Sequence, residues 1–321
     1  MTVPARVPGL RGRLPVKPPG ERFALRFVHE YVVEPLPAPS YPVDVTGGIG
    51  DQDWFMLGNG PDPTCTTHPN GVGDCGFAGR QHLRMAKAAN YGQMETWETS
   101  DELVAEYLAY DGGQDAGVNL ADVLLAWYKA GRIFGFAPVD HTDPAAVDSA
   151  MEAFNGAYAG VNLTDDANDL FSQGQPWTVA DGEQPDPDQG HCIVKVKADG
   201  RSVDGYVTWG ALQPAMVDWS AACLEEVWAV ITTEDEAAKV DMAALVADIE
   251  ALGGTVPTPA PVPPAPSPPA PPAPPVPPAP VPPAPQPANL LEELAARIRM
   301  VAASAQQDIT ELLAFLASHG L

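Results

Sequence analysis

The chain has 321 residues and a formal charge of −25, from 42 acidic and 17 basic side chains. This charge excludes nucleic acid as the main partner, because binding DNA or RNA needs a basic surface. The length indicates two domains at most. Four cysteines are too few for a disulfide scaffold. The sequence contains no apolar run of about 18 residues, so we expect no membrane span. The N-terminus lacks the apolar core of a secretory signal, so we expect synthesis in the cytoplasm.

Residues 1–50 are predicted to form an extended basic arm. The first thirty positions carry six Arg or Lys and two Glu side chains, a net charge of +4, and the remainder of the chain carries −29. Frequent prolines favour an extended course, and the run Phe23–Val33 alternates loosely, as a strand does. Such an arm either wraps its own acidic domain or reaches an acidic neighbour, and the sequence leaves both alternatives open.

Residues 51–252 are predicted to form one α+β domain. The predicted helices are Asp74–Tyr91, Ser100–Tyr110, Leu120–Ala130, Pro144–Phe154 and, closing the domain, Asp241–Leu252. The predicted strands are Tyr158–Leu163, Cys192–Ala198, Tyr206–Trp209 and Glu226–Thr232. A helical half followed by a strand-rich half is typical of α+β domains rather than of the βαβ alternation of a doubly wound sheet.

Residues 253–288 are predicted to be a proline-rich linker. Nineteen of the 37 prolines fall between Pro257 and Pro287. Proline fixes φ and lacks an N–H, so this tract favours a polyproline II rod with a reach of roughly 95 Å. We interpret it as a semi-rigid spacer; the alternative is a ligand for aromatic-lined proline-binding grooves.

Residues 289–321 are predicted to form an amphipathic helix that begins at Asn289, a suitable N-cap. Its apolar residues follow a 3-4 spacing, and such a stripe does not remain exposed to water. We therefore expect a coiled-coil self-association or docking on a partner protein. The alternative is that the helix folds back on its own domain.

The segment Gly71–Gly79, with the sequence GVGDCGFAG, delivers Cys75 to the first turn of a predicted helix. There, the helix dipole and the free N–H groups lower the pKa of a thiol, and the same N–H groups can face an oxyanion. His191 opens a later predicted strand, and the following strand ends in Trp209-Gly210. A thiol nucleophile needs a base that a third group orients, so Cys75 and His191 are the candidate catalytic pair, with Trp209 as their cover.

This order of Cys-helix, His-strand and Trp-Gly resembles the papain-like cysteine peptidases, including the bacteriocin-processing leader peptidases. Roughly residues 12–250 also look similar to papain-like proteins encoded by actinobacterial phages and prophages, through Gly12-Arg13-Leu14-Pro15, Trp54, Leu57-Gly58-Asn59 and Val207-Thr208-Trp209-Gly210. The resemblance implies a papain-like domain that acts on a peptide or isopeptide bond, with Cys75 as nucleophile and His191 as base. It implies no cofactor and no metal.

Two positions depart from the pattern of these peptidases. Val207 stands where the resemblance implies an Asn or Asp that orients the histidine, and Thr208 and Asp204 are the candidate substitutes. The Gln of the oxyanion hole has no match, and Asn59 and Asn70 are the nearest amides.

Two other interpretations of the cysteines remain open. Cys65-x-x-His68 followed by Cys75 has the spacing of a zinc site at its start. Alternatively, Cys65 and Cys75 form a local disulfide, which would silence the nucleophile.

The sequence thus leaves two functional hypotheses. In the first, the protein is a thiol hydrolase with a peptide substrate, carried on a phage virion as a decoration or accessory protein. In the second, it is an inactive structural or host-attachment protein of the same fold. Both place the protein on a virion surface, where the arm or the C-terminal helix docks on the protein lattice.

Overall fold

The computed structural model describes residues 6, 8–16, 25–93, 97–180, 182–232 and 240–252. All of them belong to one compact unit, Met1–Ala260. The proline-rich linker 253–288 and the helix 289–321 lie outside the described residues, so both stay predictions. No helix in the described ranges is both long and apolar enough to cross a bilayer.

The five predicted helices of the domain are confirmed to within one or two residues at their ends. They are α1 (Cys75–Asn90), α2 (Ser100–Tyr110), α3 (Leu120–Lys129), α4 (Pro144–Ala153) and α7 (Met242–Ala251). Local signals explain where they begin: Thr99 and Glu102 form a reciprocal capping box at α2, and Asp143 caps α4 ahead of a proline. Two short helices were not predicted, α5 (Ala167–Gln173) and α6 (Val217–Cys223).

Seven strands form one antiparallel sheet. They are β1 (Val43–Asp44), β2 (Gly135–Val139), β3 (Ala157–Asn162), β4 (Gly190–Ala198), β5 (Val203–Thr208), β6 (Ala211–Met216) and β7 (Leu224–Ile231). The order across the sheet is β2-β7-β3-β4-β5-β6, and β1 pairs with β4. Long helices come early and most strands late, so the predicted α+β class is confirmed.

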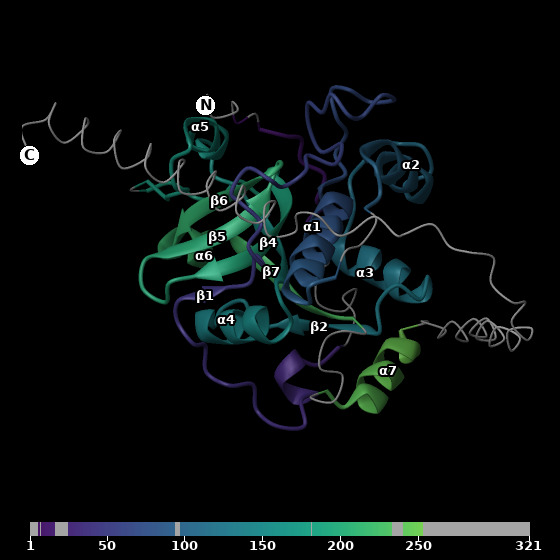
Figure 1. Ribbon diagram of the computed structural model, residues 1–321, viewed down its shortest axis with the longest axis vertical. Helices are drawn as coiled ribbons and strands as arrows, with labels where there is room; N and C mark the ends of the chain where they lie inside the picture. The colour runs from purple at the N-terminus through teal and green to yellow at the C-terminus, as the bar shows by residue number, and fades with distance from the viewer. Residues whose placement is uncertain are drawn as a thin grey trace, which may run out of the picture. The chain divides into compact units, whose positions relative to one another are not determined.

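Strand β4 lies at the centre of this arrangement. Helix α1 packs on β4 at Gly79, which has no side chain. The helix comes so close there that an added Cβ would lie 2.8 Å from Cys192 Sγ. Helix α4 reaches the other face through Asp148, whose carboxylate is 2.6 Å from Lys195 Nζ. Figure 1 shows α1 between the strands and helices α2 and α3. The N-terminal end of α1 and the beginning of β4 thereby come together, with the backbone N–H of Cys192 facing Cys75.

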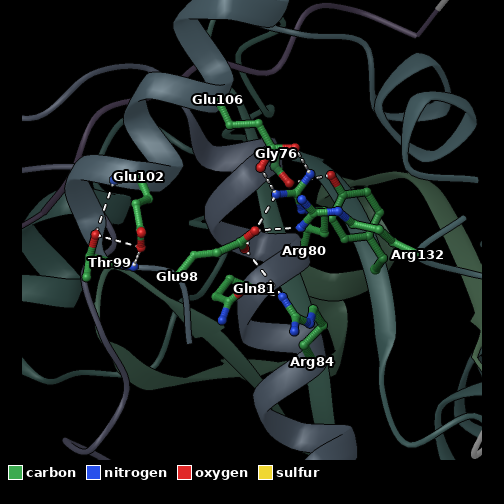
Figure 2. Close-up of polar contacts among 10 residues, drawn as sticks. Gly76, Arg80, Gln81, Arg84, Glu98, Thr99, Glu102, Glu106 and Arg132 are labelled. Carbon is green, nitrogen blue, oxygen red and sulfur yellow. Dashed lines mark hydrogen bonds and ion pairs between the residues drawn. The ribbon is translucent and has the colours of Figure 1, made fainter. Parts of the chain in front are cut away.

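A cluster of charged side chains fastens α1 to its neighbours (Figure 2). Arg80 is only 2% exposed. Its guanidinium donates two hydrogen bonds to Glu106 on α2, at 2.8 and 2.5 Å. Glu98 lies 3.7 Å from Arg80 and also pairs with Arg84 and Arg132, at 3.4 and 2.6 Å. The cluster fixes the position of α1 and hence of the residue at its start.

The strand suggested by Phe23–Val33 is not present in the described part of this run, residues 25–33. Val28–Glu30 form a turn of 3₁₀ helix (η1), and the described part of this run joins a β ladder only through a single bridge, Val32 to Val240. A loose alternation of apolar and polar residues is a weak signal for a strand, because a strand also needs a neighbouring strand to pair with. The described part of this run has only the one bridge. The described residues of the arm pack on the protein's own domain, which is the first of the two alternatives above.

Candidate active site

Cys75 is the first residue of α1, directly after a glycine-rich turn, and it is 1% exposed. The backbone N–H groups of Cys192 and Gly12 face its sulfur. Burial raises the pKa of the Cys75 thiol to about 12, although these two N–H groups oppose the shift. In this arrangement the sulfur is therefore a neutral thiol.

His191 is fully buried near the start of β4 and is held on two sides. Its Nε2 is hydrogen-bonded to Thr208 Oγ1 at 2.7 Å, and its ring stacks on Trp209 with centroids 4.7 Å apart. Nδ1 is buried and has no hydrogen-bond partner within the described residues. Burial is the largest cause that lowers the pKa of His191 to about 3, and the nearby Arg11, His82 and Arg13 contribute to the same shift.

Thr208 therefore occupies the place of the missing orienting residue. Val207 and Thr208 are adjacent on β5, so their side chains point to opposite faces of the sheet, and only that of Thr208 reaches His191. Asp204, the other candidate, lies elsewhere: its carboxylate is 2.9 Å from Lys195 Nζ and accepts a hydrogen bond from Ser220 at 2.6 Å. Of the two predicted substitutes, the structure brings only Thr208 to the histidine.

The two candidate amides of the oxyanion hole separate in the structure. Asn59 is buried beside the site, where its Nδ2 donates to the Val72 carbonyl at 3.3 Å. Asn59 also lies close to Trp209, because both residues contact Gly9. A Cβ added to Gly9 would lie 1.8 Å from the backbone oxygen of Asn59 and 2.3 Å from Trp209 Cδ1. Asn70 is exposed, and no described contact ties it to the site.

Asp74, the residue before Cys75, is a buried acidic residue beside the candidate site that was not predicted from the sequence. It is fully buried, and neither carboxyl oxygen accepts a hydrogen bond within the described residues. Burial raises its pKa well above the usual value, and the neighbouring Asn59 amide opposes the shift. Burial thus favours the protonated form of Asp74, next to Cys75; its place in Gly-Asp-Cys was the available signal.

The zinc and disulfide interpretations are both wrong. All four cysteines are free, and the Cys65 sulfur is a neighbour of Asp101, 3.5 Å from its Oδ1. Within the described ranges, no group of three or more His, Cys, Asp or Glu side chains is arranged to hold a metal ion. His68 and Cys75 therefore share no metal site with Cys65.

The arm segment, defined here as residues 8–16, passes between the helical half and the sheet half of the domain. On the helical side, Val118 N–H donates to Gly12 O at 2.6 Å and Leu14 N–H donates to Val118 O at 2.8 Å. On the sheet side, Arg13 N–H donates to Gly190 O at 3.3 Å. Because Gly12 also faces the sulfur of Cys75, the arm segment covers this thiol and contributes to its burial.

The described residues have the architecture expected of a papain-like domain, with the cysteine at the start of α1 and the histidine on the antiparallel sheet. No protein-family model matches the chain. No curated protein matches it either. Among solved structures, it is similar to the crystal structure of xylellain, a cysteine protease from Xylella fastidiosa. The two share 10% sequence identity with a TM-score of 0.48, over 73% of this chain and 100% of that chain.

Proposed function

We propose that the domain is a thiol hydrolase that cleaves peptide or isopeptide bonds, with Cys75 as nucleophile and His191 as base. The arrangement of His191 carries the proposal. Thr208 and Trp209 fix the ring, and Nδ1 is left without a partner. The residue after His191 presents its N–H to the Cys75 sulfur, which places the thiol beside the start of β4, the strand that carries the base.

The proposed reaction has two stages. His191 takes the thiol proton through Nδ1, and the thiolate attacks the carbonyl carbon, forming a C–S bond. The oxyanion faces the N–H groups of the first turn of α1 and the second amide proton of Asn59. His191 then protonates the leaving amine as the C–N bond breaks, and water hydrolyses the thioester to release the acid and restore the thiol.

This chemistry requires the arm segment to move away. While it is in place, burial holds the thiol pKa at about 12 and the imidazole pKa at about 3, so both groups are neutral. Arg11 and Arg13 of the arm segment contribute to the low pKa of His191. Without the arm, water enters, the thiol pKa falls and the imidazole pKa rises, and both changes favour proton transfer.

Opening the site by mutation tests the proposal. A Cβ at Gly12 would lie 1.4 Å from Gly73 O, so Gly12→Ala displaces the arm segment. We expect iodoacetamide at neutral pH to label Cys75 in Gly12→Ala at least tenfold faster than in the parent protein. Cys192 and Cys223, which are equally buried, should stay slow and serve as internal controls. Slow labelling of all three in a folded Gly12→Ala protein would refute the proposal.

A second candidate function is an inactive structural or host-attachment protein on a phage virion. Val207 at the expected orienting position and the neutral state of the buried pair favour it. Under this alternative, Cys75→Ala changes neither assembly nor attachment. Under the hydrolase proposal, Cys75→Ala abolishes bond cleavage by the opened protein, and Cys223→Ala leaves cleavage intact.

The virion context is common to both candidates and remains a proposal based on the sequence resemblance. The motivation is the combination of a basic arm, a proline-rich spacer and a C-terminal amphipathic helix, which suits a displayed domain better than a freely diffusing one. Detection of the chain in purified particles by mass spectrometry would support it, and detection only in the particle-free lysate would contradict it.

A further inference from the structure

We infer that the pocket around Arg13 is a recognition site for an arginine side chain of a peptide, and that the arm segment occupies it as an internal ligand. The inference deepens the proposed function, because it names the substrate class of the same site. The pocket is formed by Glu226, Asn162, Val161 and Gly160, and we call it the arginine pocket.

The contacts of Arg13 show what the arginine pocket selects. Nε lies 3.2 Å from Glu226 Oε1, and Nη1 donates to Asn162 Oδ1 at 3.0 Å and to the Val161 carbonyl at 3.3 Å. Only 1% of the Arg13 side chain and 8% of the Glu226 side chain are exposed. A carboxylate this deeply buried is strongly unfavourable without a cation, so the pocket needs a guanidinium or its equivalent.

The domain itself prepares the arginine pocket. Trp228 Nε1 donates to Glu226 Oε2 at 2.8 Å, which orients the carboxylate without help from the arm. A Cβ at Gly160 would lie 2.4 Å from Arg13 Nε, so this glycine leaves the space that the guanidinium fills. Glu226 and Trp228 also line an adjoining cavity of about 360 Å³, which offers room for residues beside the arginine.

The surroundings of the arm segment accept a peptide backbone with little regard to its other side chains. The backbone of the arm lies against three glycines, Gly73, Gly117 and Gly190. A Cβ at any of them would lie 2.4 to 2.7 Å from a carbonyl oxygen of the arm, so larger residues would not leave room for it. By contrast, Leu10 and Leu14 are 41% and 44% exposed. Arg11 is only partly buried and donates to Asn168 Oδ1 at 3.0 Å, whereas Arg13 is 5% exposed, so Arg13 is the arm side chain that the domain encloses most fully.

The arginine pocket is adjacent to the proposed nucleophile, but the arm is bound in a way that prevents its cleavage. Gly12 presents its N–H to the Cys75 sulfur, and its carbonyl accepts a hydrogen bond from Val118 instead. A substrate must place a carbonyl carbon at the sulfur. The arm thus competes for the site as an uncut occupant, and a peptide with arginine displaces it.

Peptide binding to the opened full-length protein tests the inference. The protein carries Gly12→Ala to displace the arm and Cys75→Ala to prevent turnover. The probe is a fluorescein-labelled peptide with the sequence of residues 8–16, Pro-Gly-Leu-Arg-Gly-Arg-Leu-Pro-Val. A second probe carries citrulline, which is neutral and of equal length, in place of Arg13. We expect fluorescence anisotropy to show at least tenfold tighter binding of the arginine probe, and adding Glu226→Gln to the protein should erase the difference.

Matched controls isolate the arginine pocket. Citrulline in place of Arg11, which is only partly buried, should weaken binding much less than citrulline in place of Arg13. A protein with Leu14→Ala instead of Gly12→Ala should keep its arm bound and exclude the probe. If Gly12→Ala fails to fold by circular dichroism, Arg13→Ala provides the empty pocket. Methylguanidinium should then raise the melting temperature of Arg13→Ala but not that of Arg13→Ala/Glu226→Gln.

Equal affinity for the two probes, or no binding of either to folded opened protein, would overturn the inference. So would equal responses of the two Arg13→Ala proteins to methylguanidinium. Because these readouts are independent of cleavage, arginine-dependent binding by a protein that cleaves nothing would reject the proposed hydrolase and leave the arginine pocket standing. Cleavage without preference for arginine would do the reverse.

Discussion

Thr208 orients His191 with a hydroxyl, and this choice of residue has consequences for the tautomer. When Thr208 Oγ1 accepts the proton of Nε2, Nδ1 is unprotonated and ready to take a proton from a thiol. A hydroxyl can also rotate and donate, so it holds this tautomer less firmly than a carboxylate would. Thr208 is therefore the residue on which the competence of the pair depends.

We predict that Thr208→Val lowers kcat of the Gly12→Ala protein at least tenfold with little change in KM, because the imidazole loses its orienting partner. Thr208→Ser keeps the hydroxyl and should restore most of the rate. The measurement is steady-state cleavage of an arginine-containing peptide. An unchanged kcat in Thr208→Val would show that the hydroxyl plays no part in orientation.

Two buried histidines should make the domain sensitive to acid. Burial lowers the pKa of His191 to about 3 and that of His82 to about 4, so between these values and about 6.5 the unfolded chain binds protons that the folded chain does not. The free energy of unfolding should therefore decrease as the pH falls from about 6.5. Glutamine in place of His82 can still hydrogen-bond but does not titrate. Urea titrations should therefore show that the free energy of unfolding falls between pH 7 and pH 4.5 by about 2 kcal/mol less in His82→Gln than in the parent protein. Equal losses would contradict the prediction.

The sequence singled out the candidate site residues but not the side chains that contact them. Cys75, His191 and Trp209 were predicted because each follows from a local motif at the start or end of an element. Asp204 could not be excluded beforehand, because the sequence does not show that Lys195 and Ser220 engage its carboxylate. The role of Arg13 was invisible for the same reason: its partner Glu226 lies 213 positions away.

At the scale of elements, the helices were easier to predict than the edges of the sheet. Strands β2 and β6 were missed because each contains a proline, Pro138 or Pro214, which normally argues against a strand. Both are edge strands in the observed order, where a missing N–H is tolerated. Which strand forms an edge is decided by the whole sheet, and no local window contains that information.

The charged cluster around Arg80 determines how α1 is held, so its loss should loosen the helix that begins at Cys75. We predict that Arg80→Met lowers the free energy of unfolding by about 2–3 kcal/mol, because Glu106 and Glu98 lose a shared buried cation. Arg84→Met, on the same helix but 26% exposed at its side chain, should lower it by less than about 1 kcal/mol. Guanidinium titrations give both values, and equal effects would refute the special role of Arg80.

At the scale of the whole molecule, the C-terminal amphipathic stripe is predicted to associate. We expect the full chain to sediment as an oligomer and a chain that lacks residues 289–321 to sediment as a monomer, because the apolar stripe is then absent. Analytical ultracentrifugation over a tenfold range of concentration provides the measurement. The same mass for both chains at every concentration would contradict the prediction.

The pairing of Arg13 with Glu226 also orders events during synthesis. The arm segment leaves the ribosome first, but its binding site includes β4 and β7, which are made more than 170 residues later. The arm segment can therefore bind over Cys75 only when the sheet is complete. Because this contact joins residues far apart in the sequence, we expect it to form late in folding. Until then, Cys75 lacks the cover that the arm segment provides in the folded domain.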